Sequence, residues 1–270
     1  MEHTNRLSLK KPAAGSRLKT MMAVDFRRLF TMRLLYIMVG ICLVVPILVL
    51  VMTTMMDGSV SVDPKTGVET TMHAFSSVWQ SIGSTSGCGM MNMDMTSMCN
   101  INLVYFAVAV LVCLFVSDDF RSGYAKNLFT VRAGRMEYVI SKTLVGVVSG
   151  VLMLIAYFIG SMLGGKIAGL PFELIGATTS NIVMCMLAKS LLVAVFVPLY
   201  LLMSIVAREK AWLSIMLSWF MGMFLFMMVP MITPLDAGIM NVILCLAGGV
   251  LFNLGVGMVS RQVLRRSNLL

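Results

Sequence analysis

Residues 34 to 56 read LLYIMVGICLVVPILVLVMTTMM and contain no charged side chain. An α-helix rises about 1.5 Å per residue, so a run of this length can cross the hydrocarbon core of a bilayer, which is about 30 Å thick. Beyond this run, 59% of the 270 residues are hydrophobic and only 12% are charged, against about 25% charged in soluble domains. That excess is too large for one globular core, and it predicts an integral membrane protein.

Five further apolar runs have a similar character. The predicted spans are residues 34–56, 101–116, 139–163, 182–207, 211–230 and 238–260. Pro46 and Pro198 lie inside two of them, where neighbouring helices can bond to the freed carbonyl groups, so they predict kinks rather than breaks. The runs are continuously apolar and do not alternate as barrel strands do. The expected fold class is therefore all-α integral membrane, with one transmembrane domain over residues 17–270 behind a disordered basic tail, residues 1–16.

Basic residues are distributed very unevenly between the two sides of these spans. Eighteen of the 21 lysines and arginines fall in the N-terminal segment, the loop 117–142, the turn before the fifth span and the C-terminal tail, against Lys65 and Lys166 on the opposite side. Cytoplasmic loops carry such an excess. We therefore expect a multi-pass protein of the cytoplasmic (inner or plasma) membrane, with both termini in the cytoplasm. The formal charge of +9 then reflects this asymmetry and attraction to anionic lipids, and it requires no nucleic-acid partner.

The segment before the first span has an amphipathic pattern. Leu18, Met22, Phe26 and Leu29 recur at helical spacing on one face, while basic residues lie on another. This pattern is typical of a helix that lies in the cytoplasmic interface of the membrane. The alternative is a basic tail without regular structure.

The loop 117–142 reads SDDFRSGYAKNLFTVRAGRMEYVISK and contains a short helical pattern. Ser122 can cap a helix that begins near Gly123, and Gly134 can end it. The apolar stripe between these ends consists of Tyr124, Leu128, Phe129 and Val131. A loop that only joins two spans can be far shorter, so this apolar face predicts docking on a partner or on the membrane surface. The alternative is a solvated connector.

These residues resemble the corresponding region of the ABC-2 type permease family, the membrane subunits of a large group of ATP-binding-cassette (ABC) transporters. Many members end the second span in an acidic residue, continue with Gly-Thr and a short hydrophobic helix, and reach the third span through a small-Ser-Arg triplet. The matching residues are Asp118 and Asp119, Gly123-Tyr124, Lys126-Asn127-Leu128, Ala133-Gly134-Arg135, and Lys142. Tyr124 replaces the commoner threonine and Gly134 the commoner serine. Together with six spans, inside termini and an interfacial helix, the resemblance covers essentially the whole chain.

The resemblance implies that residues 120–134 form a coupling helix, which rests in a cleft of a separate cytoplasmic ATPase. The residues implied in that contact are Asp119, Gly123, Tyr124, Leu128, Phe129, Val131 and Arg135. It further implies the permease subunit of an ABC exporter, paired with a second copy or a similar chain. ATP and magnesium would be bound by the partner subunit, so this chain itself would hold no cofactor and would not be an enzyme.

One near match to a nucleotide-binding motif does not alter this expectation. Residues 160–167 fit the phosphate-loop spacing G-x-x-x-x-G-K, but Ile167 stands where a serine or threonine should ligate magnesium. The match also falls at the outer end of the third span, where ATP is not available. The only histidines are His3 and His73, neither of which lies in a span, and no nucleophile–base pair stands out. We therefore expect any coupling to ATP to be mechanical.

The outer loop between the first two spans offers a different chemistry. Several methionines, with Met91, Met93 and Met95 among them, lie between Cys88 and Cys99. Thioether and thiol ligands select Cu(I), so the alternative function is a copper-handling membrane accessory protein without ATP coupling. The two cysteines face an oxidising compartment in this topology and can form a disulfide. Free thiols, and methionines that serve only packing, are the alternatives.

One lysine and several glycines inside the spans are also candidates. Lys189 lies in the fourth span, where a charge indicates a translocation path or a pairing between spans; the alternative is a side chain that reaches up to the outer interface. Close small-residue spacings predict tight helix packing. They occur at Gly146/Gly150, Gly160/Gly164, and Gly249, Gly255 and Gly257. The substrate is left open, with amphiphilic peptides, lipids and drugs as the candidates.

Overall fold

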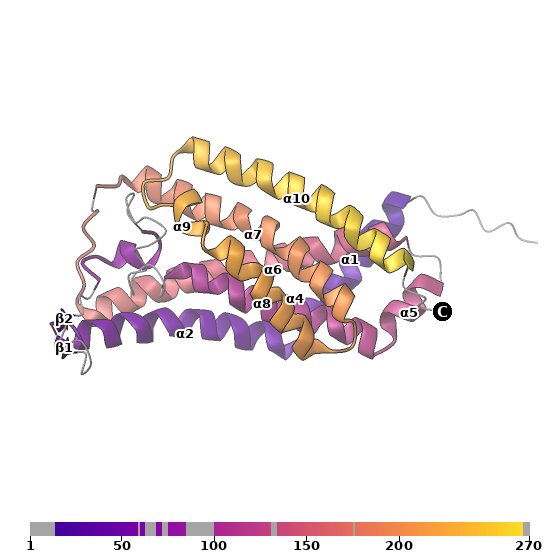
Figure 1. Cartoon of the computed structure of the whole chain (residues 1–270), viewed down its shortest axis with the longest axis horizontal. Coiled ribbons are helices and arrows are strands. Elements are labelled where there is room, and N and C mark those ends of the chain that lie inside the picture. Colours follow the sequence, from indigo (N-terminus) through magenta and orange to yellow (C-terminus); the bar gives the residue numbers. More distant parts are fainter. Residues whose placement is uncertain are drawn as a thin grey trace, which may run out of the picture.

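The computed structural model describes residues 14–58, 60–62, 69–71, 75–84, 100–130, 134–174 and 176–266. Within these residues the chain is mainly helical, and the long helices run side by side in one elongated bundle (Figure 1). The short helix α5, the helix α1 and the C-terminal end of α10 lie at one end of this bundle. The hairpin of β1 and β2 and the short helix α9 lie at the other end.

The elements follow the predicted order along the chain. The helices are α1 (Ala14–Thr31), α2 (Arg33–Met55), α4 (Val104–Arg121), α5 (Tyr124–Thr130), α6 (Arg135–Ala168), α7 (Thr179–Ala207), α8 (Ala211–Phe226), α9 (Val229–Ile232) and α10 (Ile239–Arg266). The single-turn 3₁₀ helices are η1 (Val78–Ser81) and η2 (Ile101–Leu103). The strands β1 (Val60–Val62) and β2 (Glu69–Thr71) pair antiparallel, with Val60 opposite Thr71.

Among the residues that the structure describes, five helices are long and apolar enough to cross a membrane, which supports the membrane character of the chain. They are α2, α4 together with η2, α6, α7 and α10. The predicted fifth span, residues 211–230, differs, because α8 is apolar but only 16 residues long. Pro230 lies in the first turn of α9, where the missing N–H of a proline is tolerated, and α8 ends before it. Phe226 is the last residue of α8.

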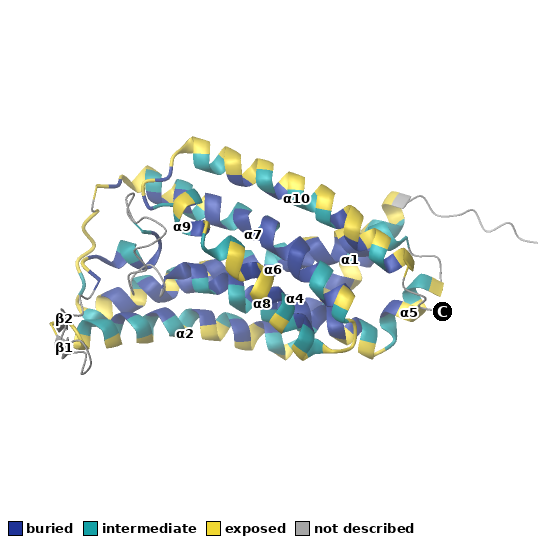
Figure 2. Cartoon of the chain, in the orientation of Figure 1, coloured by how far each residue is buried: buried dark blue, intermediate teal, exposed yellow. Residues whose placement is uncertain are grey.

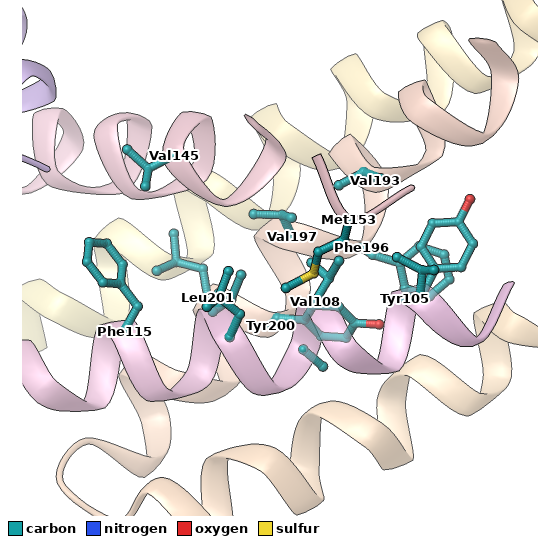
Figure 3. Close-up of a cluster of buried hydrophobic side chains, with 14 of the residues drawn as sticks. Tyr105, Val108, Phe115, Val145, Met153, Val193, Phe196, Val197, Tyr200 and Leu201 are labelled. Carbon is teal, nitrogen blue, oxygen red and sulfur yellow. The ribbon is translucent and has the colours of Figure 1, made fainter. Parts of the chain in front are cut away.

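Burial separates the helices into a central and a peripheral group. In α4 and α7, 67% of the most apolar stretch is buried, against 17% in α10. Figure 2 shows exposed positions along the outer side of α10 and α2. The core between α4, α6 and α7 is aromatic and aliphatic, with the rings of Tyr105 and Phe196 stacked 4.6 Å apart (Figure 3). Apolar side chains on the outer face are expected of a bundle whose solvent is lipid.

Glycines let α6 approach its neighbours closely. A Cβ atom on Gly146 would lie 2.7 Å from a Val197 methyl group in α7, and one on Gly160 would collide with the backbone carbonyl of Leu43 in α2. Tight packing is thus confirmed at these positions. Gly255 has open space where its side chain would be, so it has no close contact within this chain, and packing across a dimer stays a prediction there. Because residues 160–167 lie inside α6, the near match to a phosphate loop is a packing surface.

The proline inside α7 shows how the bundle satisfies a broken helix. Pro198 cannot donate to the carbonyl of Ala194, four residues before it. The side-chain amide of Asn253 in α10 donates to that carbonyl at 2.8 Å. The predicted re-satisfaction of a freed carbonyl by a neighbouring helix is therefore confirmed at this position.

Candidate functional site beneath the short helix

The predicted short helix between the second and third spans is present as α5. It begins after Gly123, whose φ of 73° favours glycine because other residues are strained there. Ser122 does not cap α5 as expected: it ends α4, and its hydroxyl donates to the carbonyl of Asp118 at 2.7 Å. Gly134 likewise does not end α5 but precedes α6, where its N–H donates to the carboxylate of Glu137 at 3.1 Å.

The apolar stripe of α5 packs against its own bundle. The ring of Phe129 lies 5.5 Å from that of Tyr138 in an edge-on contact, and Leu128 packs against the main core. Tyr124 lies under the guanidinium of Arg28, with 4.4 Å between the central carbon and the ring centroid. The described residues of the predicted stripe, Tyr124, Leu128 and Phe129, are thus partly buried against the rest of the chain. The outward positions of α5 are Lys126, Asn127 and Thr130, and Val131 lies outside the described residues.

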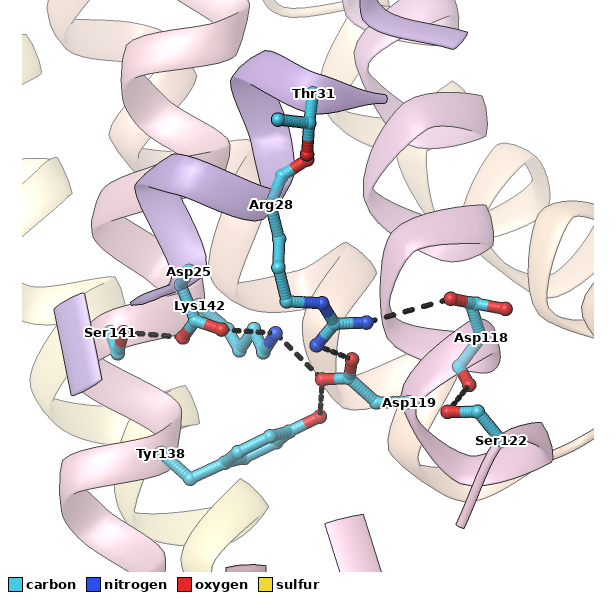
Figure 4. A network of polar contacts seen from close by, with 9 residues as sticks. All are labelled: Asp25, Arg28, Thr31, Asp118, Asp119, Ser122, Tyr138, Ser141 and Lys142. Carbon is cyan, nitrogen blue, oxygen red and sulfur yellow. Dashed lines mark hydrogen bonds and ion pairs between the residues drawn. The ribbon is translucent and has the colours of Figure 1, made fainter. Parts of the chain in front are cut away.

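A network of charged side chains joins α1, α4 and α6 (Figure 4), and it lies next to α5, because the Tyr124 ring of α5 is 5.7 Å from the Lys142 ammonium. Asp119, near the end of α4, accepts a hydrogen bond from Arg28 of α1 at 2.6 Å. Its other carboxylate oxygen accepts from the Tyr138 hydroxyl at 3.0 Å and from the Lys142 ammonium at 2.6 Å. Asp119 is fully buried, so its expected contact with a partner protein is wrong. It connects α1, α4 and α6 instead.

The network continues from Lys142 to the N-terminal helix. The Lys142 ammonium also donates to Asp25 at 2.8 Å, and the Ser141 hydroxyl donates to the second oxygen of Asp25 at 2.6 Å. Asp25 and Lys142 are both buried, and the ammonium lies 4.0 Å from the centroid of the Phe115 ring. One ammonium is therefore shared between two buried carboxylates from different helices.

The charges of this network nearly balance one another. Asp25 and Asp119 face Lys142 and the partly exposed Arg28, while the more exposed Asp118 lies 3.5 Å from the same guanidinium. Removal of one partner from such a buried pair costs about 3–5 kcal/mol, because it leaves an uncompensated charge. The network therefore holds three helices in one arrangement next to α5.

Two groups at the rim of the network have shifted pKa values. Partial burial of Arg28 disfavours its charged form, but the charge and hydrogen bond of Asp119 outweigh this and raise the pKa of Arg28. Burial, followed by the charges of Asp25 and Asp119, raises the pKa of Tyr124. At neutral pH the guanidinium is therefore charged and the phenol is neutral, which is the pairing that a cation over an aromatic ring requires.

The face that the first helix buries within the chain differs from the apolar face of its sequence pattern. Leu18, Met22, Phe26 and Leu29 were expected to face the membrane interface, whereas the buried stripe is Met21, Asp25 and Leu29. Asp25 is the only acidic residue between residues 14 and 33, and it lies at helical spacing between two apolar residues. Its position between these two apolar residues was the feature of the sequence that could have assigned Asp25 to the buried face. In addition, α1 begins at Ala14, so residues 14–16 are helical rather than part of a disordered tail.

Lys189 occupies a second buried polar site, at the opposite end of the bundle. Its ammonium donates to the side-chain oxygens of Asn102 at 2.7 Å and of Thr233 at 3.0 Å. The side chain is fully buried, so the alternative of reaching the interface is wrong, and a pairing between separate segments is present. A translocation path at Lys189 stays a prediction.

The candidate metal ligands and the candidate disulfide are not covered by the structure. Cys88, Met91, Met93, Met95 and Cys99 lie outside the described residues. Within the residues that are described, no group of three or more histidine, cysteine, aspartate or glutamate side chains could hold a metal ion. The four described cysteines are free and buried in helices.

Comparison of the chain with protein-family models, with curated proteins and with solved structures finds no match.

Proposed function

We propose that the chain is the permease subunit of an ABC exporter of the ABC-2 type. In this proposal it moves a substrate across the cytoplasmic membrane with ATP hydrolysed by a separate ATPase subunit, which also binds the magnesium. The observation that carries the proposal is the position of Asp119. This buried carboxylate joins α1, α4 and α6 next to α5, so a force on the short helix has a stiff connection to two long spans.

The proposed topology has six spans with both termini in the cytoplasm. The fifth crossing would combine α8 and α9, because α8 alone has 16 residues and at about 1.5 Å per residue falls short of a 30 Å core. The helix α1 would lie in the cytoplasmic interface. Its apolar residues Val24 and Phe30 are 41% and 46% exposed, next to the exposed Arg27, which suits a helix partly immersed among lipid head groups.

In the proposed mechanism, α5 is the coupling helix. The ATPase would contact its outward face and the flanking residues that remain from the sequence prediction. These are Gly123, Tyr124, Leu128, Phe129, Val131 and Arg135, without Asp119. Closure of the ATPase around ATP would displace α5, and the network would pass this displacement to α4 and α6 as one of two discrete arrangements. The substrate would cross between this subunit and a second permease copy or a similar chain.

The proposal predicts that an ABC ATPase is encoded beside this chain, and copurification of the two proteins tests it. Lys126→Glu combined with Asn127→Trp changes only exposed side chains of α5. We expect this variant to lose copurification of the ATPase at an unchanged melting temperature. The matched control is Lys166→Glu at the opposite end of the bundle, where Lys166 is also exposed. Full copurification by the α5 variant, with unchanged ATP-driven transport, would show that α5 is not the ATPase contact.

A further inference from the structure

An apolar groove lies between α6 and α10, away from the ionic network. It has a volume of about 490 Å³. Its walls include Ile140, Leu144 and Val147 from α6 and Leu246, Val250 and Leu254 from α10, over a floor from α7. The side chains of Val250 and Leu254 are 52% and 55% exposed, so the chain itself leaves the groove open.

A cluster of arginines continues the same helix face. Val250, Leu254, Met258, Arg261 and Arg265 follow one another at spacings of four, four, three and four residues, so they form one stripe along α10. Arg261 and Arg265, with Arg266, line a second hollow of about 450 Å³. Among the described residues no carboxylate forms an ion pair with any of these arginines. One apolar stripe thus ends in an unneutralised basic cluster.

We propose that this stripe binds an anionic phospholipid, with an acyl chain in the groove and the phosphate on Arg261 and Arg265. Arginine binds phosphate oxygens in a two-pronged geometry. The groove also has the depth of one membrane leaflet. On α10 the groove is lined from Cys245 to Leu254, which is about 14 Å of helix at 1.5 Å per residue and close to half of a 30 Å hydrocarbon core.

The expected position of the arginines on the cytoplasmic side of the membrane also favours an anionic phospholipid as the ligand. The basic cluster lies at the same end of the bundle as α1 and α5 (Figure 1), where most of the lysines and arginines of the sequence gather. The cytoplasmic leaflet is the one that carries anionic lipids and attracts basic segments. The inference does not depend on the transport function proposed above, since it rests on the groove between α6 and α10, on the arginines of α10 and on the expected cytoplasmic side of that end.

Native mass spectrometry of the purified full chain tests the proposal. Phosphatidylglycerol and phosphatidylcholine with identical acyl chains are titrated in parallel, and we expect preferential retention of phosphatidylglycerol. Arg261→Gln combined with Arg265→Gln should lower the affinity for phosphatidylglycerol about 30-fold, the loss expected for two basic side chains at an anionic surface. The matched control, Arg208→Gln with Lys210→Gln, removes two exposed charges from another cytoplasmic turn and should leave the affinity unchanged.

A second variant separates the acyl chain from the head group. Val250→Trp fills the groove from an exposed position and should lower the retention of both lipids while the arginines stay intact. Equal retention of the two lipids, an equal loss in the control, or unchanged binding by Val250→Trp would each overturn the proposal. A lipid-free wild-type dimer that Val250→Trp dissociates would overturn it too, because the groove would then hold a second copy.

Discussion

Lys142 is the residue on which the buried charges most depend. It is the only fully buried cation of the network, and it lies within 2.8 Å of Asp25 and 2.6 Å of Asp119. Without it, two carboxylates from different helices would face each other in an apolar interior. Arg28 can compensate only one of them, because its hydrogen bond and close ion pairs are with the aspartates of α4.

Replacement of Lys142 by methionine is therefore expected to destabilise the protein by about 3–5 kcal/mol, the cost of breaking a buried pair. The measurement is the thermal unfolding midpoint in detergent. The second substitution Asp25→Asn should recover part of the loss, because it removes the carboxylate that Arg28 does not reach. The control is Arg27→Gln, on the exposed face of α1, the helix that also carries Asp25. This variant should unfold at the same temperature as the wild type. An unchanged midpoint for Lys142→Met would contradict this account.

The polar site at Lys189 gives a second prediction. Lys189→Met keeps the length of the side chain but leaves the buried oxygen of Asn102 without its donor. A buried group that loses its partner in this way costs about 1–3 kcal/mol, and the same unfolding assay measures it. The comparison is Lys166→Met, whose lysine is exposed near the same end of the bundle. If both variants lost equal stability, the hydrogen bonds of Lys189 would not be the cause.

Residues of the networks were harder to predict than the spans. Asp25 and Lys142 are 117 positions apart, and Arg28 and Asp119 are 91 apart. Hydrophobic periodicity ranks Asp25 as a polar residue and so assigns it to the outer face of α1. Only the packing of three helices shows that this carboxylate turns inward. Lys189 was found because any charge within an apolar run is conspicuous.

The close contact between α6 and α2 depends on a glycine, Gly160, at the point where the helices meet. Gly160→Ala would place a methyl group against the carbonyl of Leu43, so the two helices would have to separate. We expect a loss of about 1–3 kcal/mol, the usual cost of overpacking. Gly255→Ala, in α10, makes the same chemical change in open space and should raise stability by up to about 1 kcal/mol through helix propensity. Effects of the same sign at both positions would refute the packing argument.

Helix ends show where sequence patterns succeed and where they fail. The first span was predicted within one residue at each end, because an uncharged run is bounded sharply by Arg33 and Asp57. The predicted fifth span, residues 211–230, falls on α8, which ends at Phe226, and on the start of α9, so no single helix covers the apolar run. The short helix α5 was recognised, but its two proposed boundary residues, Ser122 and Gly134, belong to the neighbouring helices.

The number of times that the chain crosses the membrane can be tested by labelling at one residue, Gln262. Gln262 is exposed in α10, beyond the segment formed by α8 and α9. With Cys88 and Cys99 replaced by serine, Gln262→Cys should react with a membrane-impermeant maleimide only from the cytoplasmic side, as Lys126→Cys should. Lys166→Cys should react only from outside. Labelling of Gln262→Cys from outside would mean that α8 and α9 do not cross.

The hydrogen bond between Asn253 and Ala194 bears on how the protein is made. The ribosome completes α7 well before Asn253 in α10 is synthesised. Until then, the Ala194 carbonyl that Pro198 leaves free lacks the donor that it has in the finished protein. An unsatisfied carbonyl in the bilayer core costs several kcal/mol. A chain that stops short of its last helix therefore carries a defect at one identifiable atom. Completion of the chain removes that defect, so the finished protein and a truncated one differ at this carbonyl.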